Sequence, residues 1–257
     1  MSDQEGVSHE VQIETAPAAD RLESQGLRPG SIWYRLVQYT MRFLLWAWRL
    51  RLCGRQHLPS RGPFLICSNH PSELDPVALG AALPFRPSFL AGHELERYPV
   101  IFWLLNRFDP VLVRRGATDI GALRACLRRL RAGDVMVIYP EGGVVQDRPL
   151  GELQSGAAFL AIRTRVPIVP AAITGIAEVW PLGARFPARW PWTRRITIRL
   201  GPPLHPKPGE RPDELTRRLE EAILELLSDG ARAGRNQALK GSGDHATAGR
   251  HLSRLIP

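Results

Sequence analysis

Cysteine is scarce in this chain and widely spaced. The 257 residues contain three cysteines, Cys53, Cys67 and Cys126, an odd number with no two close together. Secreted domains that depend on disulfides carry cysteines in larger, even numbers, and zinc sites bring them in closely spaced pairs. The sequence therefore indicates a reducing compartment, with neither a disulfide framework nor a metal site.

A long uncharged apolar run is also missing. The most apolar stretch, 33–52, is interrupted by Arg35, Arg42 and Arg49, and no uncharged run inside it exceeds six residues. A membrane-spanning helix needs about 20 predominantly apolar residues. Residues 1–29 likewise lack the cationic start and apolar core of a secretory signal. We therefore expect neither a spanning helix nor a signal peptide.

Acidic residues do not balance the basic ones beyond position 29. The formal net charge is +9, but residues 1–29 carry −4, which leaves +13 for the remainder. A basic body suits nucleic acid, an anionic membrane surface or a phosphorylated substrate. Charge alone does not choose among these partners.

Both ends of the chain lack apolar periodicity, and too little apolar area is available there to offset the entropy cost of ordering. We expect a disordered tail at 1–29 and a disordered basic tail at 230–257. Between them the sequence divides into an interfacial membrane helix at 30–56 and an α/β domain at 57–229.

The stretch 33–52 has the pattern of a helix that lies in a membrane interface. Seven-residue spacing places Arg35, Arg42 and Arg49 on one stripe, and the rest of the circumference is aromatic and aliphatic. Cations then face lipid phosphates while the apolar side enters the bilayer. The alternative is an amphipathic helix docked on the protein's own core. The tryptophans and the absence of acids from Ser31 to Gln56 favour the membrane.

From residue 63 onward, short apolar runs alternate with segments of helical periodicity. This alternation is typical of α/β domains, in which helices connect parallel strands. We expect a largely parallel mixed sheet flanked by helices, preceded by the N-terminal interfacial amphipathic helix. The predicted strands are 63–68, 87–91, 109–113, 135–139, 168–174 and 195–200. The predicted helices are 72–82, 95–107, 118–132, 152–164 and 212–228.

A histidine and an aspartate stand five positions apart just after the first of these strands, as His70 and Asp75. An imidazole held by a carboxylate is suited to removing a proton from a hydroxyl. Taken alone, a pair with this spacing is more often an ordinary core or surface histidine. However, Arg115 and Glu141 also follow predicted strands, and ligand sites of open α/β sheets lie beyond the carboxyl ends of the strands. The three groups are therefore expected to converge.

Four blocks occur in a fixed order, namely 69–75 with His70 and Asp75, Val113–Arg115, Tyr139–Gly142 and Val166–Pro170. Together they resemble the glycerolipid acyltransferase family, typified by 1-acyl-glycerol-3-phosphate acyltransferases, over roughly residues 35–203. The resemblance implies that His70 is the general base on the acceptor hydroxyl and that Asp75 orients it. It also implies an acyl thioester donor, either acyl-CoA or acyl-carrier protein, and neither a cofactor nor a metal.

The resemblance also suggests substrate-binding residues. Strand alternation favours Arg115 as the contact to an acceptor phosphate, with Arg114 as the second choice and a solvated arginine as the structural alternative. Glu141, Gly142 and Gly143 are expected to contact the acceptor. The family usually has threonine and then arginine or serine where this chain has Gly143 and Val144. The expected acceptor is 1-acylglycerol-3-phosphate, and the alternative is a different polar lipid or glycolipid.

A second aromatic and cationic segment follows the last block. Trp180, Trp190 and Trp192 alternate there with Arg185, Arg189, Arg194 and Arg195. Such a segment suits a membrane interface or single-stranded nucleic acid. Nucleic acid binding, and equally a silent lipid-binding relative, leaves the pair of His70 and Asp75 unused. We therefore expect a lysolipid acceptor, an anionic membrane surface and no nucleic acid, with the protein peripheral or monotopic on the cytoplasmic face of a membrane.

Overall fold

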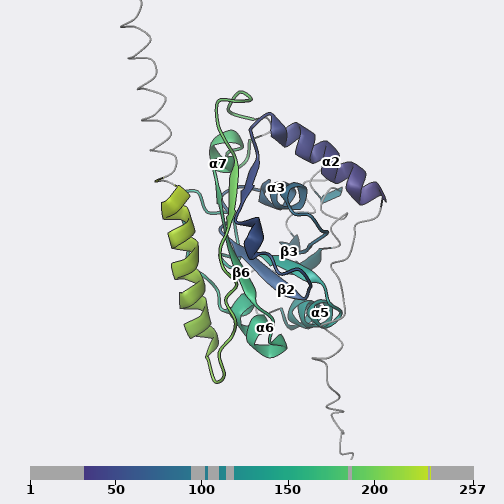
Figure 1. The fold of residues 1–257 in the computed structure, drawn as a ribbon, viewed down its shortest axis with the longest axis vertical. Helices are drawn as coiled ribbons and strands as arrows, with labels where there is room; N and C mark the ends of the chain where they lie inside the picture. Colours follow the sequence, from purple (N-terminus) through teal and green to yellow (C-terminus); the bar gives the residue numbers. More distant parts are fainter. Residues whose placement is uncertain are drawn as a thin grey trace, which may run out of the picture.

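The computed structural model describes residues 32–93, 102–103, 110–113, 119–184, 187–230 and 232. These residues contain a seven-stranded sheet in the order β1-β7-β6-β2-β5-β3-β4 (Figure 1). The strands are β1 (Arg51–Cys53), β2 (Phe64–Ser68), β3 (Ser88–Gly92), β4 (Val111–Val113), β5 (Val135–Ile138), β6 (Ile168–Thr174) and β7 (Thr197–Leu200).

Helices cover the sheet on both sides (Figure 1). They are α2 (Ile32–Trp46), α3 (Asp75–Ala82), α5 (Ile120–Arg131), α6 (Gly156–Thr164), the short α7 (Ile176–Val179) and a helix over 212–230, with a 3-10 turn at Arg55–His57. The Asp119 side chain caps α5 by accepting a hydrogen bond of 2.9 Å from the amide of Ala122. The predicted helix at 95–107 lies outside the described residues except for 102–103.

The sheet is largely parallel, as predicted. Strand β2 lies at its centre and pairs in parallel with β5 and β6, while β3 pairs in parallel with β5 and β4. Only the β6–β7 pairing is antiparallel among the described strands, and β1 pairs in parallel with β7. All six predicted strands are present, each within about two residues of its expected ends.

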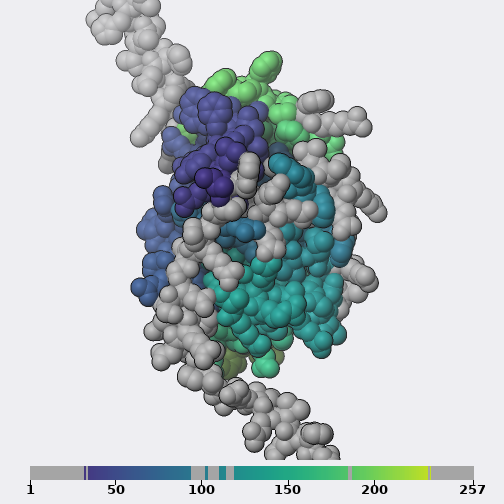
Figure 2. Space-filling model, turned by 90° about the vertical axis from the view of Figure 1, so that its right-hand side faces the viewer, coloured from purple at the N-terminus to yellow at the C-terminus, as the bar shows by residue number. Residues whose placement is uncertain are grey.

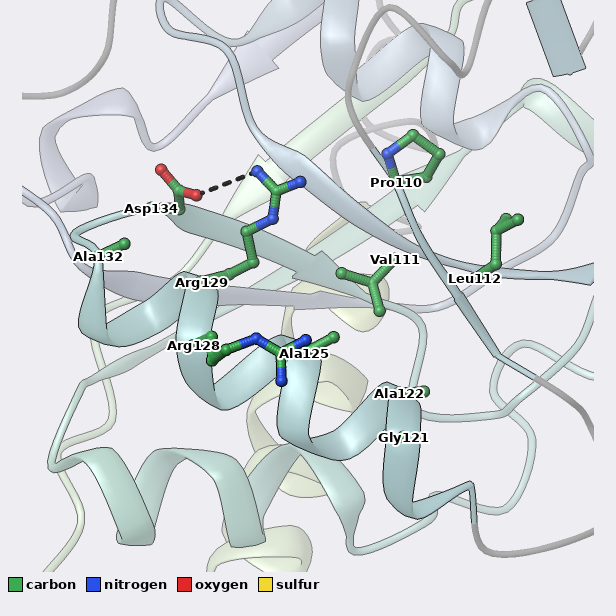
Figure 3. Close-up of a pocket in the computed structure, with 10 residues that line it drawn as sticks. All are labelled: Pro110, Val111, Leu112, Gly121, Ala122, Ala125, Arg128, Arg129, Ala132 and Asp134. Atoms are coloured by element: carbon green, nitrogen blue, oxygen red, sulfur yellow. Dashed lines mark hydrogen bonds and ion pairs between the residues drawn. The ribbon is translucent and has the colours of Figure 1, made fainter.

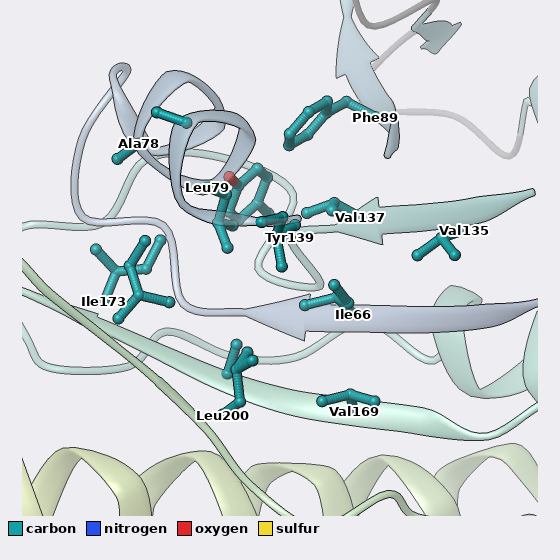
Figure 4. Packing of buried hydrophobic residues seen from close by; sticks show 14 of the residues in the cluster. Ile66, Ala78, Leu79, Phe89, Val135, Val137, Tyr139, Val169, Ile173 and Leu200 are labelled. Carbon is teal, nitrogen blue, oxygen red and sulfur yellow. The ribbon is translucent and has the colours of Figure 1, made fainter. Parts of the chain in front are cut away.

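Alternation along the strands sends side chains into two separate cores. Phe64 and Ile66 of β2 belong to the core shared with α2 and α3, whereas Leu65 and Cys67 belong to the core beneath α5, α6 and the helix over 212–230. Figure 4 shows part of the first core, with strand side chains packed beneath α3. Because both faces are covered, the strands have continuous apolar runs rather than alternating polar residues.

Helix α2 packs against α3 through one of its faces. The buried Tyr34 hydroxyl donates to the carbonyls of Gly80 and Phe85 at 3.4 and 3.3 Å. Gln38 Nε2 donates to the carbonyls of Gly80 and Leu83 at 2.9 and 2.7 Å. The alternative interpretation, an amphipathic helix docked on the protein's own core, is therefore correct for this face. The opposite face stays exposed and apolar, with Ile32, Leu36, Tyr39, Phe43 and Trp46.

The predicted helix over 30–56 is wrong in its C-terminal part. Helix α2 ends at Trp46, Arg49 takes a positive φ of 53° in the following turn, and Arg51–Cys53 form strand β1. The amide of Arg51 donates to the Ile196 carbonyl at 3.0 Å, which starts the pairing with β7. The helical stripe therefore contains Arg35 and Arg42 but not Arg49. None of the described helices is long and apolar enough to cross a membrane.

The expected tail at 1–29 lies outside the described residues, as does the expected tail at 230–257 except for residues 230 and 232. The described part of 57–229 forms one continuous sheet with its helices. Strand β1 lies outside the predicted limits of that domain but belongs to the same sheet.

Candidate active site

The candidate site begins where the chain leaves β2 at the centre of the sheet. The buried Asn69 side chain accepts a hydrogen bond from the Ile173 amide at 2.7 Å and donates one to the Ile173 carbonyl at 3.0 Å. These two bonds tie the end of β2 to the neighbouring strand β6. They fix the direction in which the next residue, His70, leaves the sheet.

His70 and Asp75 form the pair that their spacing suggested. Nδ1 of His70 lies 2.8 Å from Oδ2 of Asp75, which also accepts a hydrogen bond from the Ser72 amide at 2.8 Å. His70 is 8% exposed and Asp75 is fully buried. Because the carboxylate accepts from Nδ1–H, the other ring nitrogen, Nε2, keeps the lone pair that can take a proton.

The helix that follows starts later than predicted. Helix α3 begins at Asp75, preceded by Leu74 at the N-cap and with Pro76 in its first positions. Residues 72–74, which were expected to be helical, therefore lie before the helix. The intervening residues form a turn, closed by the Asp75 amide donating to the Ser72 carbonyl at 3.1 Å and by the Asp75 side chain reaching back to the Ser72 amide.

Burial dominates the electrostatics of the pair. Removal from water raises the pKa of the Asp75 carboxyl above its ordinary value. The hydrogen bond and charge of His70, and then the hydrogen bond from the Ser72 amide, act in the opposite direction, and the charge of Glu141 adds to the rise. The carboxylate is thus a charge placed in a dry interior, where its interaction with an imidazolium is weakly screened.

Glu141 braces the site from a second loop. Its Oε2 accepts from the backbone amide of His70 at 2.8 Å, and its Oε1 accepts from the amide of Gly151 at 2.8 Å. The His70 carbonyl in turn accepts from the Val145 amide at 2.9 Å. Both backbone polar groups of His70 are therefore bound to the loop that starts at Glu141.

The expected substrate contacts differ in how the structure places them. Glu141 lies against His70, but both of its oxygens are engaged by backbone amides. Gly142 has a positive φ of 74°, and its amide donates to the Tyr139 carbonyl at 3.0 Å rather than pointing to a ligand. Gly143 lies in the same loop and is partly buried. Arg115, with its second choice Arg114, lies outside the described residues.

Three further residues at the site were not assigned from sequence. The Tyr139 ring stacks on the His70 ring with centroids 4.1 Å apart and planes at 16°. Ser72 Oγ donates to the Trp180 carbonyl at 3.0 Å, and Gln146 Nε2 donates to the Pro71 carbonyl at 2.7 Å. The sequence predicts Tyr139 only as the last residue of a strand, because an apolar run ending in tyrosine carries no signal of a ring contact with a residue after the neighbouring strand.

A cavity of about 500 Å³ lies elsewhere, between β4 and α5 (Figure 3). Pro110, Val111 and Leu112 form one wall, and the small residues of α5 form the other. An ion pair of 3.4 Å between Arg129 and Asp134 stands at one end (Figure 3). Neither His70 nor Asp75 lines this cavity.

Comparison with known proteins agrees with the geometry. The family model described as Acyltransferase matches residues 49–174. The chain is 27% identical over 208 residues to a 1-acyl-sn-glycerol-3-phosphate acyltransferase of Pseudomonas aeruginosa, covering 76% of this chain and 77% of that protein. Residues 49–174 therefore carry the domain of the acyltransferase family, and the chain is similar to glycerolipid acyltransferases.

Other family members match over shorter shares. A chloroplastic 1-acyl-sn-glycerol-3-phosphate acyltransferase of Brassica napus is 30% identical over 134 residues, which is 51% of this chain but 39% of that protein. An Arabidopsis thaliana relative of the same name is covered over 49% of its length. The chain therefore spans about half or less of these two relatives. The crystal structure of a 1-acyl-sn-glycerophosphate (LPA) acyltransferase from Thermotoga maritima has the same fold, with a TM-score of 0.63 at 22% identity over 76% of this chain and 78% of that one.

The acyltransferase blocks meet in the structure through the sheet. The fourth block, Val166–Pro170, enters β6, where Pro170 pairs with Cys67 of β2 two residues before the start of the first block. The third block follows β5, the other neighbour of β2. Parallel strands side by side thus bring the first and third blocks, with His70 and Glu141, to the same edge, as expected from the sequence. The third group expected there, Arg115, lies outside the described residues.

We predict that Glu141→Gln loosens this candidate site without unfolding the chain. Glutamine keeps one acceptor oxygen, so either the His70 amide or the Gly151 amide loses a charge-assisted bond that contributes about 1.5–3 kcal/mol. Hydrogen exchange should show faster exchange at these two amides, and the melting temperature should fall. The matched control is Glu152→Gln, which removes the same charge from an exposed position. Equal stability and exchange in the two variants would contradict the bracing role.

Proposed function

We propose that the protein transfers a fatty acyl group from an acyl thioester to a hydroxyl of a lysophospholipid, with 1-acylglycerol-3-phosphate as acceptor. The observation that carries this proposal is the buried pair of His70 and Asp75, with Nδ1 and Oδ2 2.8 Å apart at the carboxyl edge of the sheet. The donor is acyl-CoA or acyl-carrier protein, and the proposed reaction requires neither a metal nor a cofactor.

The chemistry follows from the free ring nitrogen. Nε2 of His70 takes the proton of the acceptor hydroxyl while the oxygen of that hydroxyl attacks the thioester carbonyl. Asp75 stabilises the imidazolium that forms. Collapse of the tetrahedral intermediate forms the new ester and breaks the C–S bond. The leaving thiolate takes the proton from His70, so the products are a diacyl lipid and a free thiol.

We predict that His70→Ala abolishes transfer while the chain stays folded, as followed by circular dichroism and by assay with a labelled acyl thioester. Asp75→Asn should lower turnover by about 10²- to 10⁴-fold, because the ring loses its orientation and its counter-charge. Near-normal turnover of the His70→Ala variant would sink the mechanism.

We predict that Asp75→Asn, which lowers turnover, gains in free energy of unfolding relative to wild type as the pH rises. Burial raises the folded-state pKa of Asp75, so ionisation of this group costs stability as the pH rises through that pKa. The uncharged asparagine removes the cost. The difference in free energy of unfolding should therefore shift in the variant's favour with rising pH, as followed by denaturant titration.

A different polar lipid or glycolipid acceptor is the second candidate. Gly143 and Val144 stand where the family usually has a threonine and then an arginine or serine. These two positions therefore carry neither the hydroxyl nor the cation that would suit an acceptor phosphate. Arg148 in the same loop is exposed and lies 3.6 Å from Asp147.

We predict that Arg115→Ala raises the KM for a phosphorylated acceptor by about 10- to 100-fold, because a charge-assisted contact to phosphate contributes about 1.5–3 kcal/mol. The KM for the donor should stay within about twofold by the same reasoning, since the contact is made to the acceptor. Arg124→Ala, an exposed arginine on α5, is the control. Equal wild-type activity on phosphate-free lysolipids would favour the second candidate instead.

We further propose that the protein binds an anionic membrane surface from the cytoplasmic side without crossing it. Two segments far apart in the sequence, helix α2 and the segment that contains Trp192, support this proposal because their exposed aromatic side chains are in contact. The Trp46 and Trp192 rings are in edge contact with centroids 6.3 Å apart, and Phe43 stacks on Trp46 at 6.4 Å. Trp192 also donates its amide to the Ala47 carbonyl at 2.7 Å. We call the combined exposed face the aromatic surface, formed by Ile32, Leu36, Tyr39, Phe43, Trp46, Trp190 and Trp192.

Cations lie next to the aromatic surface. The amide of Arg49 donates to the Trp46 carbonyl at 2.8 Å, and burial together with the nearby charges of Arg51 and Arg49 lowers the pKa of Arg195. Figure 2 shows the outer side of α2, in purple, at the surface of the molecule. Aromatic rings at the headgroup level with cations beside them suit an anionic interface.

We predict that the double variant Trp46→Ser, Trp192→Ser binds anionic vesicles about 100-fold or more weakly in a flotation assay. Each tryptophan side chain that becomes buried in the bilayer contributes about 1.5–3 kcal/mol to binding. High salt should weaken wild-type binding only in part, because the apolar contribution remains. Leu224→Ser, on the helix over 212–230 on the opposite side of the sheet, is the matched control. Unchanged flotation of the double variant would rule out the aromatic surface as the membrane contact.

A further inference from the structure

Tyr139 makes the only ring stack on His70 among the described residues. It directly follows β5 and is 9% exposed, and its ring lies nearly parallel to the imidazole at 16° with centroids 4.1 Å apart. Figure 4 shows Tyr139 between the end of β5 and helix α3, beside Leu79. One face of the His70 ring is thus covered by the face of the Tyr139 ring.

The hydroxyl of Tyr139 contributes nothing to this contact. It is buried, and no described residue forms a hydrogen bond with it. Oδ1 of Asp75 is likewise buried and has no hydrogen-bond partner among the described residues. Burial raises the pKa of the Tyr139 phenol well above its ordinary value, and the charge of Asp75 adds to the rise. The phenol therefore stays neutral and donates no proton to the reaction. What Tyr139 offers His70 is the face of its ring.

The face of an aromatic ring attracts a cation, and the attraction grows where water is excluded. His70 is neutral before the proposed transfer and becomes an imidazolium when it takes the acceptor's proton. Among the described residues, the charged groups bonded to it are the Asp75 carboxylate, at Nδ1, and the Glu141 carboxylate, at its backbone amide. Asp75 fixes the ring within its own plane. The Tyr139 ring limits rotation out of that plane.

We propose that Tyr139 is a positioning residue for His70, holding the imidazole flat against its ring and stabilising the imidazolium formed during acyl transfer. This inference rests on the proposed function. It predicts that the aromatic face is required and that the hydroxyl is dispensable.

The first test separates ring from hydroxyl. Tyr139→Phe keeps the ring, so its kcat should stay within about twofold of wild type, and its melting temperature should be equal or higher because an unpaired buried hydroxyl is removed. Tyr139→Leu loses the face, so its kcat should fall by about 5- to 30-fold, with both KM values changed by less than about twofold. A fall in the Phe variant as large as that in the Leu variant would overturn the proposal.

The second test keeps the shape of the ring. Phenylalanines carrying one to three fluorines at position 139 weaken the negative face stepwise without removing the ring. The kcat should decline with each fluorine, and the acid limb of the pH–rate profile should move to lower pH because the imidazolium is less stabilised. A kcat and a pH profile that do not respond to fluorination would overturn the proposal, even if the Leu variant fails to fold.

A measurement made without substrate separates failure of this proposal from failure of the proposed function. The ring nitrogens of His70, assigned by comparison with His70→Ala, can be titrated by nuclear magnetic resonance in each fluorinated variant. Their midpoint should move to lower pH with each fluorine. If wild type transfers no acyl group to any lysolipid but the midpoint moves, the stacking holds and the proposed function fails. A constant midpoint overturns the stacking role regardless of activity.

Discussion

The hydrogen bond between Asp75 and His70 is the constraint on which the rest of the site depends. A fully buried carboxylate is unfavourable unless its charge is met by donors, and here Nδ1 of His70 and the amide of Ser72 both reach Oδ2 at 2.8 Å. Those two donors sit on the turn between β2 and α3. The turn must therefore keep one shape, and this explains why α3 starts at Asp75 rather than directly after His70.

A turn of this kind holds its shape only if its backbone is fixed from outside. Asn69 ties its start to β6 through two hydrogen bonds with Ile173. Glu141 and Val145, from the loop after β5, bind the amide and the carbonyl of His70. Since β5 and β6 are the two neighbours of β2, the turn that carries His70 is held from both sides by the strands beside it. Such support suits the proposed role of His70 as general base, because small misplacement of a reacting group costs a large factor in rate.

The sequence predicted those features that depend on local pattern. The strands were found because both sheet faces are covered, which leaves continuous apolar runs, and the pair of His70 and Asp75 was found because both partners lie within one turn. Local sequence pattern did not predict the features that depend on residues far away in the sequence. Arg51–Cys53 is a strand only because Ile196 and β7 lie beside it, and nothing local distinguishes it from the end of an amphipathic helix. The bonds from Glu141 to the amides of His70 and Gly151 had no local signal either, because the sheet order sets that partnership.

Helix α2 shows why two interpretations of one amphipathic pattern need not exclude each other. Its Tyr34 and Gln38 donate to carbonyls at the C-terminal end of α3, among them that of Gly80, groups that a helix end leaves without intrahelical partners. The same helix α3 begins with Asp75. One short helix of eight residues therefore connects the exposed aromatic face of α2 to the carboxylate that orients His70. Any surface that binds the aromatic face is held at a fixed distance from the nitrogen that is the proposed general base. For an acceptor that resides in a membrane, this fixed distance sets how far its hydroxyl must rise from the headgroup level to reach His70.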